Sequence, residues 1–255
     1  MSKILVLGGL SFRGRTLSLH IIKNNLASKL LIVDKLVPQA AFLTKEMTEL
    51  FEPHLLQADI ARPESSQKVF EKENWEYVYN MIADIPCNQD NSVYRHGILN
   101  QSVVPASIAM KKGYLKCWVQ ISSYEVYKSS HEPKTEDSPI KPCSNRGKWF
   151  AKTEAELQKI KGLPLVILRT ASTWGPYCVT ESLIWAVMGD VYKYLGEPIP
   201  MIGRPDTRQN GVHVNDVVKA FIYLSMNWYR PGIMGKKTPI FNLSDKHDMS
   251  KSWFL

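Results

Sequence analysis

Short apolar runs alternate with longer amphipathic stretches from the first residues of this 255-residue chain. The runs are rich in valine, isoleucine and leucine, and we predict them as strands at 3–7, 30–33, 77–82, 117–122 and 164–169. Helical patterns separate them near 12–25, 40–52, 90–111 and 148–161. Strands that are almost wholly apolar and alternate with helices are typical of a parallel sheet covered on both faces. The pattern therefore predicts a doubly wound α/β fold.

The alternation of strand and helix patterns becomes less regular after about residue 172. Helical patterns remain at 180–195 and 214–229, and short strand patterns remain at 199–203 and 239–244. We therefore divide the chain into a large domain, residues 1–171, and a smaller lobe, residues 172–255, which is interleaved with the last strands of the sheet. No internal repeat, low-complexity segment or long linker interrupts either part.

Composition excludes several classes of protein. Hydrophobic residues make up 44% and charged residues 22%, which is ordinary for a folded domain rather than a disordered chain. No stretch reaches the roughly 20 apolar residues that span a bilayer, so we expect a cytoplasmic protein without a membrane partner. The net charge of +8 is spread along the chain without a basic run, which argues against nucleic acid as the partner.

The cysteines do not indicate a metal site or a disulfide framework. There are four of them, without CxxC spacing or a nearby histidine cluster, at Cys87, Cys117, Cys143 and Cys178. We expect no bound metal, and we expect these side chains to be buried free thiols.

The segment "KILVLGGLSFRGRTLSLHIIKNN" reads as a strand, a glycine-containing turn and a helix. Gly8 and Gly9 allow a tight turn close to a pyrophosphate, and Gly14 allows the helix to pack close to the sheet. The N–H groups at the start of the helix then face the anion. Glycines in a strand-to-helix turn can also serve geometry alone, but this order of elements favours dinucleotide binding.

Asp34 ends the second predicted strand, twenty residues after Gly14. A carboxylate at this place accepts hydrogen bonds from the adenosine ribose hydroxyls. The same charge repels a 2′-phosphate, so NAD is favoured over NADP. Arg13 and Lys35 lie near these residues in the sequence, and their positive charges leave the choice between NAD and NADP open.

Further motifs follow the glycine loop in a fixed order. They are "GGLSFRG" (8–14), "ADI" (58–60), "NMIAD" (80–84), "ISSYEVY" (121–127), "LRTASTWGP" (168–176) and "VHVNDVVKA" (212–220). In this order and spacing they resemble the extended short-chain dehydrogenase/reductase family, the NAD-dependent sugar-nucleotide epimerases and dehydratases. The resemblance implies a Rossmann-type fold, an NAD cofactor and a small-molecule substrate, with a sugar nucleotide as the expected class.

The resemblance also implies roles for particular residues. The loop residues would surround the cofactor pyrophosphate, with Ser11 where the family has its central glycine. Asp59 would meet the adenine amino group, Ile60 would meet its ring, and Ser123 stands where the family has its active-site serine or threonine. The complete set implied for the cofactor is Gly8, Gly9, Ser11, Phe12, Arg13, Gly14, Asp34, Asp59, Ile60, Ala83 and Lys152.

Two departures from the family's pattern bear on which substrate is expected. The family usually has an arginine four residues before the histidine of "VHVND", where it contacts a sugar-nucleotide phosphate, and this chain has Gln209 there, with Arg208 beside it. Relatives usually continue beyond "FNLSD", so recognition of a whole nucleotide sugar and truncation of the lobe stay open. A homodimer through the helices near 90–111 and 148–161 is implied by the resemblance alone.

The segment "NRGKWFAKTEAE" carries half of the family's YxxxK pair. In the family, a tyrosine and a lysine one helical turn apart share the proton chemistry with the serine. Lys152 keeps the lysine, which binds the nicotinamide ribose, but Lys148 replaces the tyrosine. No tyrosine occurs anywhere between Lys128 and Lys161, so a shift of the alignment supplies none.

Several interpretations of Lys148 remain. Two ammonium groups one turn apart disfavour each other's charge, so Lys148 could itself be the acid/base. A tyrosine from elsewhere, Tyr127 or Tyr177, could enter the site instead. The protein could also bind dinucleotide without hydride transfer, as a sensor or scaffold, or be an RNA-associated member of the fold. In the plainest interpretation Lys148 is a solvated helix residue and Lys152 pairs with Glu156.

Overall fold

The computed structural model describes residues 2–178, 181–199, 210–229 and 237–246. Within these residues, seven parallel strands form one sheet in the order β3-β2-β1-β4-β5-β6-β9. The strands are β1 (Ser2–Leu7), β2 (Ala27–Asp34), β3 (Leu55–Gln57), β4 (Tyr77–Asn80), β5 (Cys117–Ser123), β6 (Leu165–Thr170) and β9 (Ile240–Leu243). The order reverses between β1 and β4, and a doubly wound sheet binds ligands at that point of its carboxyl edge.

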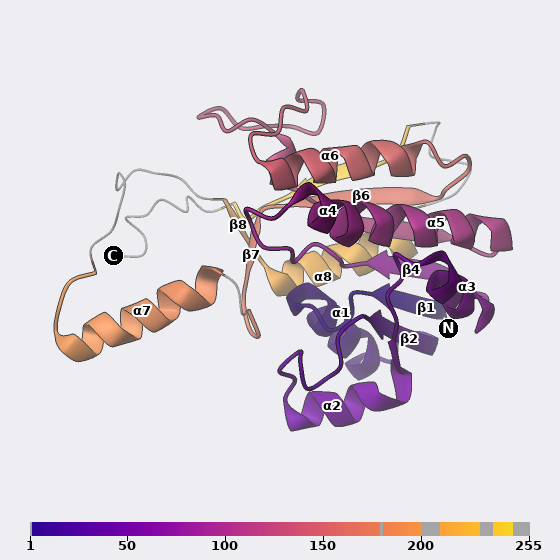
Figure 1. The fold of residues 1–255 in the computed structure, drawn as a ribbon, viewed down its shortest axis with the longest axis horizontal. Coiled ribbons are helices and arrows are strands. Elements are labelled where there is room, and N and C mark those ends of the chain that lie inside the picture. The colour runs from indigo at the N-terminus through magenta and orange to yellow at the C-terminus, as the bar shows by residue number, and fades with distance from the viewer. Residues whose placement is uncertain (1, 179–180, 200–209, 230–236, 247–255) are drawn as a thin grey trace.

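Helices cover both faces of the sheet (Figure 1). They are α1 (Phe12–Lys23), α2 (Lys45–Phe51), α3 (Pro63–Glu71), α4 (Asn91–Tyr94), α5 (Gln101–Lys112), α6 (Asn145–Gln158) and α8 (Val214–Ile222), and the chain has a further helix, α7 (Glu181–Leu195). A second pair of parallel strands, β7 (Ser172–Trp174) and β8 (Gly211–His213), lies beside the sheet. Helix α7 lies apart from these layers in Figure 1.

The side chains of β1 point alternately to the two faces of the sheet, and each face has its own hydrophobic cluster. Ile4 and Val6 belong to a cluster that contains α1 and α8, including Leu17 and Phe221. Leu5 and Leu7 belong to a second cluster, with residues of α3, α5 and α6. Because successive side chains of a strand point to opposite faces, a strand buried on both sides must be apolar throughout, as "ILVL" is.

A proline shapes the helical segment that follows β4. Helix α4 continues through a π-helical turn, Arg95–Asn100, into α5. Pro105 has no N–H to donate to the carbonyl of Gln101 one turn earlier. Asn80, at the end of β4, donates to this carbonyl instead, with an N···O distance of 3.2 Å. Its side-chain oxygen accepts from the Ile82 N–H, so Asn80 fixes the backbone that leaves β4.

The predicted doubly wound α/β fold is confirmed, with small shifts at the ends of elements. Helix α2 begins at Lys45 rather than near residue 40, and α6 begins at Asn145 rather than at residue 148. Helix α3 is not among the helices predicted from the sequence. The predicted strand at 199–203 lies almost wholly outside the described residues. The division at residue 171 stays a prediction, and β9 from the second part completes the edge of the sheet beside β6.

The expectation for the cysteines was wrong at two positions. Cys117 is buried in β5, but Cys87 and Cys143 are exposed and Cys178 is half-buried. Cys87 and Cys143 lie in loops, where no sheet packs over them. Among the described helices, none is long and apolar enough to cross a membrane.

Candidate cofactor-binding and active site

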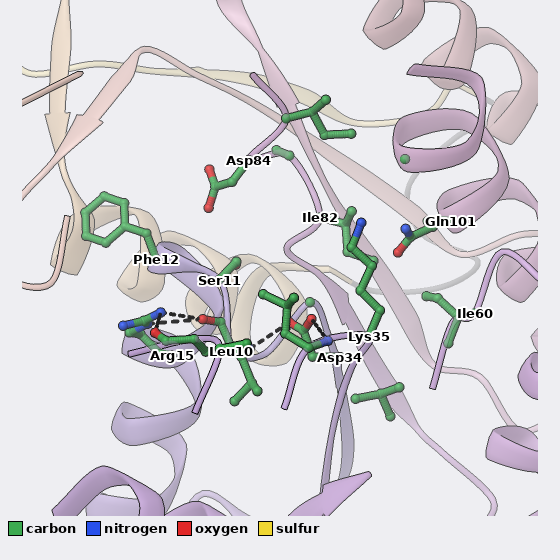
Figure 2. A pocket seen from close by; sticks show the side chains of 18 of the residues that line it. Leu10, Ser11, Phe12, Arg15, Asp34, Lys35, Ile60, Ile82, Asp84 and Gln101 are labelled. Atoms are coloured by element: carbon green, nitrogen blue, oxygen red, sulfur yellow. Dashed lines mark hydrogen bonds between the residues drawn. The ribbon is translucent and has the colours of Figure 1, made fainter. Parts of the chain in front are cut away.

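A cavity of about 270 Å³ lies at the carboxyl edge of the sheet, beside the reversal of strand order (Figure 2). It is lined by the glycine loop, the ends of β2 and β4, and one helical wall. The lining includes Gly8, Leu10, Ser11, Phe12, Asp34, Lys35, Ile60, Ile82, Ala83, Asp84, Gly97 and Gln101. The cavity therefore lies where the sequence predicted the adenosine half of a dinucleotide.

The glycine loop brings strand and helix into backbone contact. Gly8 has φ +72°, a conformation that L side chains rarely adopt. A Cβ added at Gly14 would lie 2.0 Å from the Gly8 carbonyl oxygen. Only glycine at position 14 lets α1 begin this close to β1, which aims the first turn of the helix at the cavity.

Ser11 occupies the position of the family's central glycine and caps α1. Its backbone is extended, and its Oγ accepts a hydrogen bond from the Gly14 N–H at 3.1 Å. A helix leaves its first N–H groups without intrahelical partners, so those of Phe12 and Arg13 remain for an anion. The serine therefore satisfies one donor of the first turn and leaves two.

Asp34 ends β2 and is buried, with 8% of the residue exposed. Its two oxygens accept from the N–H groups of Leu10 and Leu36 at 2.9 and 3.1 Å. Burial raises the pKa of its carboxyl group, while the bonds from Leu36 and Leu10 oppose that rise. Each carboxylate oxygen has a further lone pair, so Asp34 can also accept from a ribose hydroxyl.

Asp59 follows β3, and a histidine already contacts it. His96 Nε2 lies 3.0 Å from Asp59 Oδ2, while Oδ1 accepts from the Ala61 N–H. His96 belongs to the π-helical turn, so sequence periodicity gave no signal for this contact. Ile60 and Ala83 line the cavity, whereas Asp59 is not one of its lining residues.

Ser123, Lys148 and Lys152 lie on the other side of the strand reversal. Ser123 ends β5, is half-buried, and its Oγ accepts from the Glu125 N–H at 3.2 Å. Lys148 and Lys152 are exposed on α6, and Lys152 Nζ lies 4.8 Å from the centroid of the Trp149 ring. None of these three residues lines the cavity of Figure 2.

The two tyrosines considered as substitutes differ in their surroundings. Tyr127 is buried; its hydroxyl accepts from Arg169 Nη1 at 2.5 Å and donates to Asn242 Oδ1 at 2.9 Å. Tyr177 is 43% exposed. Entry of Tyr127 into the active site would therefore break both hydrogen bonds, of which the one from Arg169 is buried. Arg208 and Gln209 lie outside the described residues.

A buried ion pair beside Ser123 was missed by the sequence analysis. Glu154 of α6 and Arg169 of β6 are joined by Nε–Oε1 and Nη2–Oε2 contacts of 3.0 and 2.6 Å. Ser122 Oγ donates to Glu154 Oε1 at 2.5 Å. Burial opposes the charge of Arg169, but the hydrogen bonds and charge of Glu154 raise the Arg169 pKa. The signal for this pair in the sequence is Glu154 itself, a carboxylate on the buried face of α6 between Phe150 and Leu157.

A model of the NAD dependent epimerase/dehydratase family matches residues 4–233. The chain belongs to this family. Among its curated relatives, dTDP-glucose 4,6-dehydratase of Salmonella typhimurium is 23% identical over 246 residues, covering 86% of this chain and 67% of that protein. The dTDP-D-glucose 4,6-dehydratase of Dictyostelium discoideum is 23% identical over 251 residues, covering 87% of this chain and 55% of that protein. This chain therefore spans about half to two thirds of their length.

Solved structures of family members share the fold. The dTDP-glucose 4,6-dehydratase of Bacillus anthracis, in complex with NAD, has a TM-score of 0.78 at 20% identity, with 98% of this chain and 78% of that chain covered. The UDP-glucose 4-epimerase of Thermotoga maritima, with UDP-glucose, has a TM-score of 0.77 at 21% identity, with 99% and 80% covered. The family assignment and the fold drawn from the sequence motifs are both confirmed.

Proposed function

We propose that this protein binds NAD(H) and transfers hydride to or from a hydroxyl-bearing carbon of a sugar nucleotide or a related substrate. The observation that carries the proposal is the cradle formed by Gly8, Gly14 and Asp34 at the strand reversal, which fits the adenosine diphosphate part of a dinucleotide. Arg13 adds a buried Nε that has no hydrogen-bond partner among the described residues. A bound pyrophosphate would supply the missing acceptor.

Particular residues would hold the cofactor. Gly8, Gly9 and Ser11 would surround the pyrophosphate, with the N–H groups of Phe12 and Arg13 donating to it. Asp34 would bind the adenosine ribose, and Lys152 the nicotinamide ribose. Asp59, Ile60 and Ala83 would enclose the adenine. Bound NAD would supply the hydride acceptor.

Side chains of the protein itself would carry out the proton transfer. Ser123 would hydrogen-bond the reacting oxygen from the end of β5, and Lys148 would exchange the proton with it. Residues 172–255 would form the lobe that holds the substrate. A homodimer through α5 and α6 and a cytoplasmic location are further parts of this proposal.

Lys148→Ala is expected to lower kcat by about 10²- to 10⁴-fold, the usual contribution of a positioned general acid or base. The measurement is the change in nicotinamide absorbance with NAD and either dTDP-glucose or UDP-glucose. Lys148→Tyr should retain turnover, because a phenol four residues before Lys152 restores the family's pair. Lys159→Ala, which removes an exposed lysine from the end of the same helical segment, should leave kcat unchanged.

Two results would contradict this assignment. Unchanged kcat in Lys148→Ala would remove Lys148 from the mechanism. Tight NAD binding without turnover across a panel of sugar nucleotides would replace the enzyme by a non-catalytic dinucleotide-binding protein.

Asp34 is expected to set the choice between NAD and NADP. Its buried carboxylate would repel a 2′-phosphate, so NAD should bind at least about tenfold more tightly than NADP. Asp34→Asn keeps one acceptor oxygen and removes the charge, so the ratio of the two dissociation constants should fall toward one. Asp59→Asn is the control, because it should change both constants equally. An unchanged ratio in Asp34→Asn would show that another residue makes the choice.

A further inference from the structure

Arg13 connects three segments that are distant in the sequence. From the first turn of α1, its Nη2 forms an ion pair with Asp84 Oδ1, and its Nη1 donates to Thr173 Oγ1 at 3.1 Å. The Arg13 side chain is 12% exposed and that of Asp84 is 24% exposed. We call Arg13, Asp84 and Thr173 the arginine bridge.

The arginine bridge crosses the strand reversal. Arg13 follows β1, Asp84 follows β4, and Thr173 lies in β7, directly after β6. A dinucleotide in a doubly wound sheet lies across the carboxyl ends of the strands, with its pyrophosphate at the start of the first helix. Its second nucleotide must therefore pass the place where Arg13 reaches over to Asp84 and Thr173.

The cavity of Figure 2 reaches this bridge at Asp84. Of the three bridge residues, Asp84 lines the cavity and Arg13 and Thr173 do not, and no described residue of β5, β6 or α6 lines it. Its volume of about 270 Å³ is near the lower end of the range for small-molecule sites, roughly 300 to 1,000 Å³. With the bridge closed, the cavity suits one nucleotide rather than two.

The charges around the bridge favour a diphosphate on the adenosine side. Arg13 Nε is buried and has no partner within the described part of the chain, although both terminal nitrogens of the same guanidinium are engaged. The free N–H groups of Phe12 and Arg13 lie on the same turn. A phosphate there can take all three donors and leave the contacts to Asp84 and Thr173 intact.

We propose that the arginine bridge makes this site selective for adenosine 5′-diphosphate and its small esters, and that a full dinucleotide binds only after Arg13 leaves Asp84 and Thr173. ADP binds with the bridge closed and gains the partnerless Nε donor. NAD gains the same contacts but must also break the bridge. This inference rests on the cofactor site of the proposed function and names Arg13 as the residue that sets its ligand preference.

The test is calorimetric titration of the full chain with ADP and with NAD. In the unmodified protein, ADP should bind at least as tightly as NAD. Arg13→Met removes the bridge together with a phosphate donor, whereas Asp84→Asn weakens the bridge and keeps the donor. In both variants the ratio of the NAD to the ADP dissociation constant should fall at least tenfold. Lys35→Met alters the cavity wall away from the bridge, so it should leave the ratio unchanged.

The outcomes separate this inference from the proposed function. NAD binding more than tenfold tighter than ADP in the unmodified protein, or a ratio that neither variant changes, would overturn the inference alone. The expected shift in ratio without turnover of any sugar nucleotide would overturn the catalytic proposal alone. Failure of both ligands to bind would overturn both.

Discussion

Glu154→Ala is expected to lower the free energy of unfolding by about 3 to 5 kcal/mol, because removing one partner of a buried pair leaves the other charge uncompensated. The side chains of Glu154 and Arg169 are 5% and 3% exposed, so water cannot replace the lost carboxylate. The same carboxylate accepts from Ser122, the neighbour of Ser123. The loss should therefore also misplace the candidate active-site serine. Urea denaturation of the variant gives the free energy directly.

Two comparisons make this result specific. Glu156→Ala removes the same charge from the same helix, but Glu156 pairs with Lys159 near the surface, and we expect a loss of about 0.5 kcal/mol or less. The double variant Glu154→Leu with Arg169→Met removes both charges and should recover most of the stability. Equal losses in Glu154→Ala and Glu156→Ala would show that burial of the first pair has no energetic consequence.

Gly14→Ala is expected to lower the free energy of unfolding by about 3 kcal/mol and to abolish detectable binding of both NAD and ADP. The added Cβ would lie 2.0 Å from Gly8 O and 2.8 Å from both Gly8 C and Gly9 Cα. These are backbone atoms of the glycine loop, so no side chain can move aside. Helix α1 must shift, and its first N–H groups then leave the cavity. Denaturation and calorimetric titration measure the two effects.

Gly189 provides the matched control. It also lies within a helix, α7, but an added Cβ would meet no atom of the described part of the chain within 4 Å. Gly189→Ala should therefore raise stability by about 0.5 to 1 kcal/mol, since alanine loses less conformational freedom than glycine in a helix. A small effect of Gly14→Ala on both stability and binding would mean that α1 tolerates a shift away from β1.

Local features of the chain could be predicted from the sequence. The strands, the glycine loop and Asp34 are fixed by short-range patterns: strand periodicity, backbone conformation, and the end of a strand in a parallel sheet. Their burial and positions in the structure agree with those patterns. The cap formed by Ser11 is local as well, because serine before a helix commonly accepts from the third helical residue.

Contacts between distant segments could not be predicted in the same way. Arg13 meets Asp84 and Thr173 across 71 and 160 residues, and their pairing depends on the strand order rather than on any spacing. The position of Glu154 on the apolar face of α6 indicates burial, but only the placement of β6 against α6 shows that its partner is Arg169. The orientation of Lys152 over Trp149 is likewise a matter of side-chain packing, so the roles of Lys148 and Lys152 remain predictions.

The helical wall of the cavity has an unusual anchor. In an unbroken α-helix, every interior carbonyl is already used by the N–H four residues later. Pro105 withholds that proton, so Gln101 keeps a carbonyl that can bind outside the helix, and Asn80 takes it. The missing N–H of Pro105 therefore lets Asn80 hold this helical wall against the sheet. The position of Gln101 in the cavity wall is set by a residue one turn further along that does not itself line the cavity.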